Sequence, residues 1–155
     1  MSKSANRHIE ETVKALLTEE DLKAVENAVK SFEDRTSGEI VVSFQMLSKG
    51  DPEKAARKIF KRLKLCRTAE RNATLIVLYI ASRKFAVIGD QGIDEKVPQD
   101  FWDSTVAAMG DHFRAGRIKD GLVEGIDILG EALSKYFPVS SDDINELSDE
   151  LHYGH

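Results

Sequence analysis

The chain has 155 residues, of which 41% are hydrophobic and 32% charged, and its net charge is −5. This length suits one domain with a sizeable core, and the composition is that of a globular protein and not of a disordered one. The longest apolar run, Leu75 to Ala81, is far shorter than the ~20 residues that cross a bilayer. A single cysteine, Cys66, excludes an internal disulfide and a cysteine-cluster metal site.

The negative charge is concentrated at the C-terminal end. Residues 138–155 contain five acidic residues and no Lys or Arg, so 22 of the 27 acids remain to balance the 22 bases. Nucleic-acid binding needs a basic face, and the composition gives that function class no support. Residues 1–8 lack the apolar stretch of a secretory signal, and no membrane segment is visible, so the cytoplasm is the expected location.

The first half of the chain predicts helices before and after one strand. Apolar residues recur at helical spacing from Arg7 to Leu17, and Thr18 then begins a second helix as its N-cap, with acidic residues in the first turn. The β-branched and aromatic residues of Glu39 to Leu47 predict a strand. A third helix begins at Asp51 and Pro52, which suit the cap and the first helical position.

The second half predicts a hairpin followed by helices. A polar loop, Cys66 to Ala73, leads into Thr74 to Ala81, a nearly continuous apolar run typical of a strand buried on both faces. Ser82 and Arg83 are expected to turn the chain into a third strand, Lys84 to Ile88. The next segment, Gly89 to Gly92, is expected to be a loop, since its two glycines allow close backbone approach.

Two closing helices are expected, one after Pro98 that ends near Gly116 and one from Ile118 to about Phe137. Residues 138–155 contain few apolar residues and are predicted to form an acidic, mobile tail behind a single domain, residues 1–137. A helix joins the first two strands, which should therefore be parallel, and the third strand should run antiparallel to the second. The fold class is thus α/β, a small mixed sheet with helices on both faces.

This topology brings three segments to one edge of the sheet. Parallel strands start at the same end and an antiparallel partner finishes there, so Ser37 to Glu39, Cys66 to Ala73 and Gly89 to Gly92 should converge. The polar side chains delivered to this edge include Glu39, Arg67, Thr68, Glu70, Arg71, Asn72, Asp90 and Asp94. Carboxylates and carbonyls on a glycine-containing loop suit Ca²⁺ or Mg²⁺. Arg67 and Arg71 could instead hold a phosphate or pair with the acids.

Other interpretations of these residues stay open. Asp90 also suits ordinary turn chemistry, because loops at a sheet edge are solvated and polar. The spacing of Asp90 and Asp94 is not that of an EF-hand. The chain contains no His-Glu-x-x-His, Gly-x-Ser-x-Gly or P-loop pattern, which argues against zinc peptidases, nucleophile-elbow hydrolases and P-loop nucleotide hydrolases.

Several segments resemble the TPM domain family. They are Thr36–Val42, Arg71–Tyr79, Arg83–Ile93 and the helical stretch Phe113–Ile126, and the ending, residues 138–150, is similar to that of short stand-alone bacterial members. The resemblance spans roughly residues 10 to 150. It implies an α/β/α sandwich, in agreement with the order of elements.

The resemblance also implies divalent-cation binding, with Ca²⁺ favoured over Mg²⁺, and the acid phosphatase activity of the plant thylakoid branch. Asp90 matches the family's Gly-rich loop and Glu39 its strand-entry motif, so Asp90, Glu39 and Asp94 are the predicted metal ligands. No transit peptide, membrane anchor or Gly-rich tail is visible in this sequence, and the photosynthetic and membrane roles of other branches are not carried over.

Three functions follow as hypotheses for a chain expected to be a monomer. The first is a Ca²⁺- or Mg²⁺-binding accessory domain in protein quality control or assembly. The second is a metal-assisted phosphatase in which Arg67 or Arg71 neutralises the phosphoryl oxygens, although the sequence identifies no nucleophile or general acid. The third is a protein-interaction module without metal that docks an unknown protein partner through the acidic tail, Ser140 to Leu151.

Overall fold

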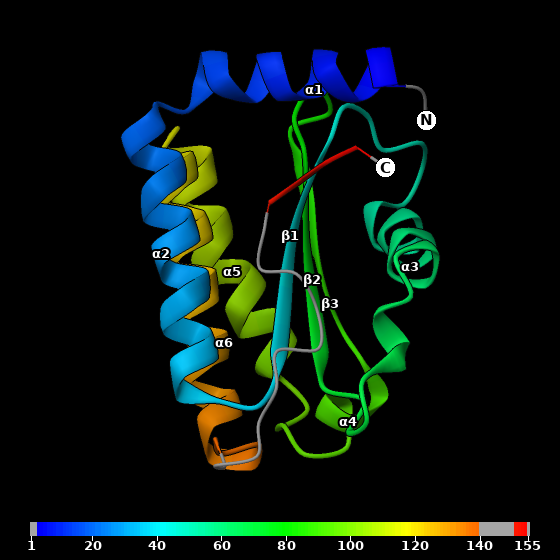
Figure 1. Cartoon of the computed structure of the whole chain (residues 1–155), viewed down its shortest axis with the longest axis vertical. Coiled ribbons are helices and arrows are strands. Elements are labelled where there is room, and N and C mark those ends of the chain that lie inside the picture. The colour runs from blue at the N-terminus through cyan, green and yellow to red at the C-terminus, as the bar shows by residue number, and fades with distance from the viewer. Residues whose placement is uncertain (1–2, 140–150, 155) are drawn as a thin grey trace.

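The computed structural model describes residues 3–139 and 151–154. Its elements in chain order are α1 (Lys3–Leu16), α2 (Glu19–Arg35), β1 (Glu39–Gln45), α3 (Pro52–Arg62), a 3₁₀ turn (Leu65–Arg67), β2 (Ala73–Tyr79), β3 (Lys84–Gly89), α4 (Gln91–Asp94), α5 (Phe101–Arg114), α6 (Ile118–Tyr136) and β4 (His152–Tyr153). Figure 1 shows the sheet between α3 on one side and α2, α5 and α6 on the other, with α1 lying across one end.

The sheet has the mixed topology that the sequence predicts. In the described part of the chain its strand order is β3-β2-β1-β4. β1 and β2 are parallel, with Glu39 opposite Ala73, whereas β2 and β3 are antiparallel, with Thr74 opposite Gly89. The helical connection between β1 and β2 and the short turn between β2 and β3 account for these two directions.

One strand, β4, was not predicted. It lies in the segment for which the sequence predicts a mobile tail, of which residues 140–150 lie outside the described residues. β4 pairs with β1 through two residues, and Gly154 N donates to Phe44 O at 2.7 Å. The Tyr153 ring stacks on Phe44 with their centroids 5.4 Å apart, and Leu151 packs against the same core. The described end of the chain is therefore attached to the sheet.

Each face of the sheet covers its own hydrophobic core. Alternate residues of a strand point to opposite faces. Val42 and Ile76 therefore face α2, α5 and α6, whereas Val41 and Leu75 face α3. All four side chains are buried, which explains why β2 is an almost uninterrupted apolar run. Burial of each such side chain stabilises the fold by about 1.5–3 kcal/mol. The two cores confirm the predicted α/β/α sandwich.

The predicted helix starts at Thr18 and Asp51 are confirmed, with one difference after β3, and the first helix begins earlier than predicted, at Lys3 instead of near Arg7. Thr18 Oγ1 accepts from Asp21 N at 3.0 Å and Asp21 Oδ2 accepts from Thr18 N at 3.1 Å, which forms a capping box. Asp51 caps α3, with Pro52 at its first position. The difference is the expected loop Gly89–Gly92, which runs into the short helix α4 because Asp90 acts as its N-cap. Among the described helices, none has the length and apolar character that a bilayer span requires.

Candidate functional site

The three segments predicted to converge are hydrogen-bonded to one another at one end of the sheet. Glu39 N donates to Asn72 O at 3.2 Å, which ties the start of β1 to the start of β2. Asp90 N donates to Ala73 O at 2.9 Å, and Gly92 N donates to Arg71 O at 2.9 Å. The end of β3 is therefore held against the loop that precedes β2, and the predicted convergence is confirmed.

At this edge of the sheet, the carboxylates of Glu39 and Asp90 lie on either side of a small residue, Ala73. Glu39 is opposite Ala73 in the parallel pair, and Asp90 follows Gly89, the partner of Thr74, in the antiparallel pair. Residues directly opposite each other point to the same face of a sheet. Glu39, Ala73 and Asp90 therefore form a row across three strands, on the face that α3 covers. Glu39 is 4% exposed and Asp90 5%, so both carboxylates are buried.

Asp90 forms a bidentate ion pair with Arg71. Arg71 Nε donates to Asp90 Oδ2 at 2.7 Å and Arg71 Nη2 donates to Asp90 Oδ1 at 2.8 Å. Asp90 Oδ1 also accepts from Gln91 N at 2.8 Å. These hydrogen bonds raise the pKa of the Arg71 guanidinium above its usual value. Of the two roles that the sequence left open for Arg71, the structure shows the pairing with an acid.

The backbone of Arg71 has a φ of 53°, in the left-handed region that residues with a side chain rarely adopt. The Arg71 side chain remains 42% exposed even though its partner carboxylate is buried. The Arg71 guanidinium therefore reaches solvent, whereas the carboxylate that it pairs with is buried. Arg67, the other predicted anion-binding residue, ends the 3₁₀ turn and is exposed.

The third predicted ligand, Asp94, is bonded to another element. Asp94 Oδ1 accepts from Trp102 Nε1 at 2.8 Å, and the Trp102 ring lies against Gly89. This contact was not predicted because it depends on the direction of the short helix α4. Among the described residues, no group of three or more His, Cys, Asp or Glu could hold a metal ion. A cation at this edge would therefore also need amide, carbonyl or water oxygens.

One amide oxygen at the edge is buried without a donor. Asn72 is 1% exposed, and its Oδ1 has no hydrogen-bond partner among the described residues. Asn72 N donates to Thr68 Oγ1 at 3.1 Å, so the residue is held in place by the loop that carries Arg67 and Arg71. Buried acceptors are normally satisfied, and an exception calls for an explanation such as an ion or a water.

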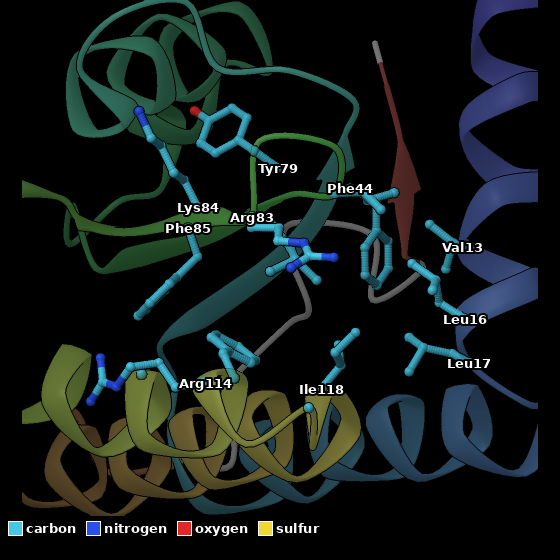
Figure 2. A pocket seen from close by; sticks show the side chains of 15 residues that line it. Val13, Leu16, Leu17, Phe44, Tyr79, Arg83, Lys84, Phe85, Arg114 and Ile118 are labelled. Atoms are coloured by element: carbon cyan, nitrogen blue, oxygen red, sulfur yellow. The ribbon is translucent and has the colours of Figure 1, made fainter.

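A cavity at the opposite end of the sheet was not predicted. It has a volume of about 810 Å³ and is lined by residues from α1, the far ends of β1 and β2, the β2–β3 turn, α5 and the start of α6 (Figure 2). Its walls combine residues far apart in the sequence, such as Val13, Phe44, Phe85 and Ile118. A local pattern does not reveal such an assembly, and Arg83 was expected only to form part of a turn.

Comparison with known proteins gives one family match and several structural neighbours. The family model described as the TPM domain matches residues 12–132. No curated protein matches the sequence. Among solved structures, the BA42 protein of the psychrophilic bacterium Bizionia argentinensis is 40% identical, with a TM-score of 0.83 over 89% of this chain and 95% of that one.

Two more distant structures share the fold. The N-terminal domain of a protein from P. gingivalis is 18% identical, with a TM-score of 0.65 over 79% of each chain. The N-terminal domain of the cg2496 protein from Corynebacterium glutamicum is 15% identical, with a TM-score of 0.62 over 90% of this chain and 84% of that one. At these identities the likeness concerns the fold alone.

Proposed function

The chain belongs to the TPM domain family, and from this premise we propose that it binds a divalent cation, Ca²⁺ in preference to Mg²⁺, between Glu39 and Asp90. The observation that supports this proposal is the row in which these two buried carboxylates lie on either side of Ala73. Arg71 already pairs with one of these carboxylates, Asp90. Two carboxylates on one face repel each other, and a divalent cation that binds both of them removes this repulsion.

The composition of the edge suits a hard cation. Ca²⁺ takes about six to eight oxygen ligands, at roughly 2.3–2.6 Å. Glu39 and Asp90 would supply carboxylate oxygens, and the buried Asn72 Oδ1 would supply an amide oxygen. Ala73, with only a methyl side chain, stands between the two carboxylates in this row. Asp94 would contribute through the oxygen that Trp102 does not engage, or through a bound water.

Arg71 competes with a cation for the carboxylate of Asp90. Without a cation, the guanidinium neutralises Asp90 through two hydrogen bonds. Cation binding at Asp90 requires these bonds to break, and the half-exposed Arg71 side chain would move toward solvent. The measured affinity would then equal the intrinsic affinity of the oxygens reduced by the stability of the ion pair.

Titration of the full chain with Ca²⁺ tests the proposal. We expect saturable changes in the backbone amide resonances of residues 38–40 and 89–94, and in the fluorescence of Trp102, the single tryptophan, which is bonded to Asp94. Asp90→Asn keeps an N-cap side chain and should weaken Ca²⁺ binding at least about tenfold. Asp100→Asn removes the same charge from an exposed residue whose side chain forms no capping bond, and should leave the affinity unchanged. Equal binding by wild type and Asp90→Asn would reject the site.

A second pair of variants tests the competition. Arg71→Gln should bind Ca²⁺ about tenfold more tightly, because a charge-assisted hydrogen bond contributes roughly 1.5–3 kcal/mol. Arg67→Gln removes an equal charge nearby and should raise the affinity only about twofold, since salt screens exposed charges. If the two variants bind Ca²⁺ equally well, Arg71 acts only through its charge, and the proposed competition between Arg71 and Ca²⁺ for Asp90 is wrong.

We propose binding rather than hydrolysis at this site. A phosphatase would use Arg67 or Arg71 for the phosphoryl oxygens, and the guanidinium of Arg71 is already engaged by Asp90. Hydrolysis of an aryl phosphate that requires Ca²⁺ or Mg²⁺ and is lost in Asp90→Asn would favour the phosphatase hypothesis instead. The accessory role in quality control or assembly and the interaction module remain predictions from the sequence.

A further inference from the structure

The cavity at the far end of the sheet has the dimensions of a small-molecule site. Its volume of about 810 Å³ lies within the range of roughly 300–1,000 Å³ that ligand pockets span. It opens between the junction of α1 with α2, the turn between β2 and β3, and the turn between α5 and α6 (Figure 2). The candidate cation site lies at the opposite end of the same strands, so the two are separate.

The larger part of the cavity wall is apolar. Val13 and Leu17 line one side, Phe44 closes the end of the sheet, and Phe85 packs edge-on against Phe113 with their centroids 4.8 Å apart. Leu16 lines the same cavity and is 53% exposed, so its aliphatic side chain is open to water. An apolar surface open to water marks a place where a ligand or partner gains by covering it.

The charge of the lining has one sign. Arg83, Lys84 and Arg114 line the cavity, and none of the described lining residues is acidic. Arg114 already pairs with Asp111. Lys84 alternates with Phe85 along β3, and Figure 2 shows its side chain on the side of Tyr79, away from the apolar walls. Arg83 is the remaining cation.

Arg83 is placed to receive an anion. Its backbone φ of 53° is left-handed, and in Figure 2 its head group lies between Phe44 and Phe85. The Arg83 side chain forms no hydrogen bond or ion pair with any other residue in the described ranges. A guanidinium beside an apolar wall favours a carboxylate, whose two oxygens match its donors.

We propose that this cavity binds a linear amphipathic carboxylate, such as a free fatty acid, with the head group on Arg83 and the alkyl chain against Leu16, Phe85 and Ile118, which keep accessible surface in the lining. A single cation without a partner in the described ranges, next to a recess, suits one anionic head group with an apolar chain. The alkyl chain of a fatty acid needs no polar partner along the apolar part of the wall.

Binding of monomeric dodecanoate to the full chain, measured by calorimetry below its micelle concentration, tests the proposal. We expect one ligand per chain and an affinity that rises about two- to fourfold per methylene from octanoate to dodecanoate, since burial of a methylene contributes ≈ 0.8 kcal/mol. Dodecyltrimethylammonium, which has the opposite charge, should bind at least about tenfold more weakly. An affinity that does not depend on chain length or on head-group charge would overturn the assignment.

Matched variants locate the head group. Arg83→Asn removes the cation and keeps a residue that tolerates the left-handed backbone, and it should weaken dodecanoate binding about tenfold or more. Lys84→Gln removes the same charge from the adjacent position, whose side chain lies on the other side, and should change the affinity less than twofold. Leu16→Ser, at a half-exposed position, should reduce the gain per methylene. Equal effects of Arg83→Asn and Lys84→Gln would show that no specific head-group site exists.

Two further measurements separate this proposal from its alternatives. Binding to phosphatidylglycerol vesicles without binding of monomeric dodecanoate would identify a lipid surface as the partner and reject the cavity. Asp90→Asn should bind dodecanoate like the wild type, because Asp90 lies at the other end of the sheet. The carboxylate proposal can therefore be confirmed or rejected independently of the proposed cation site.

Discussion

Replacing Gly92 with alanine should destabilise the edge that carries Asp90. A Cβ at Gly92 would lie 2.7 Å from Arg71 O and closer still to Glu70 O, where an ordinary contact exceeds 3.0 Å. Both neighbours are backbone atoms and cannot rotate away. The start of α4 would have to move, and the hydrogen bond from Gly92 N to Arg71 O at 2.9 Å would be stretched.

The magnitude follows from three contributions. Overpacking costs about 1–3 kcal/mol, and we expect the upper part of this range because the obstacles are backbone. Loss of the hydrogen bond adds about 0.5–1.5 kcal/mol. The higher helix propensity of alanine returns at most about 1 kcal/mol. The free energy of unfolding should therefore fall by about 2–3 kcal/mol, which corresponds to a decrease of about 1 M in the urea midpoint.

Urea unfolding followed by Trp102 fluorescence measures this change. Gly50→Ala is the matched control, because Gly50 has a left-handed φ of 76° but no atom lies within 4 Å of the position that its Cβ would take. It should lose only the backbone strain energy, about 1–2 kcal/mol. If Gly92→Ala unfolds at the same urea concentration as Gly50→Ala, the two loops do not approach each other closely and the packing described for this edge is wrong.

Two other predictions concern the scaffold. Burial raises the pKa of Tyr79 to about 12, and its hydroxyl donates to Pro52 O at 3.0 Å. Because the pKa is higher in the folded protein, neutral Tyr79 contributes to the free energy of unfolding. This stabilisation is fully present below pH 10 and is lost as the pH rises to 12. It reaches at most about 2.7 kcal/mol at 1.36 kcal/mol per pKa unit. Tyr79→Phe should remove this fall in the free energy of unfolding between pH 10 and pH 12. A fall equal to that of the wild type would show that Tyr79 is not its cause. Thr18→Ala should cost about 1 kcal/mol through loss of the cap, whereas Thr18→Ser should restore thermal stability.

Helix starts and strand directions could be predicted because their causes are local or topological. Thr18 and Asp51 cap helices through bonds within three residues, and the helix between β1 and β2 determines that they are parallel. The pairing of β4 could not be predicted in this way. Only two of its residues pair with β1, and they follow an acid-rich stretch in which no periodic pattern marks a strand.

The candidate site was predictable to the level of segments and not to that of contacts. Topology was sufficient to bring Glu39, Arg71 and Asp90 to one edge. The row across Ala73 depends on the register of two strand pairs, and the bond of Asp94 to Trp102 depends on how α4 and α5 are oriented. Neither the row nor this hydrogen bond can be predicted from the spacing of residues along the sequence. The cavity at the other end of the sheet is even harder to predict from the sequence, since its lining residues come from several elements.

Strand β3 connects Arg83, which precedes it, to Asp90, which follows it. Its six residues span about 20 Å at ~3.3 Å each, and positions seven apart in a strand face opposite sides. All six are paired with β2, and a slip of one residue would exchange their inward and outward side chains. The hairpin therefore has no neighbouring register through which an event at one end could be transmitted. Occupancy at the two ends should be thermodynamically uncoupled, with binding free energies that simply add.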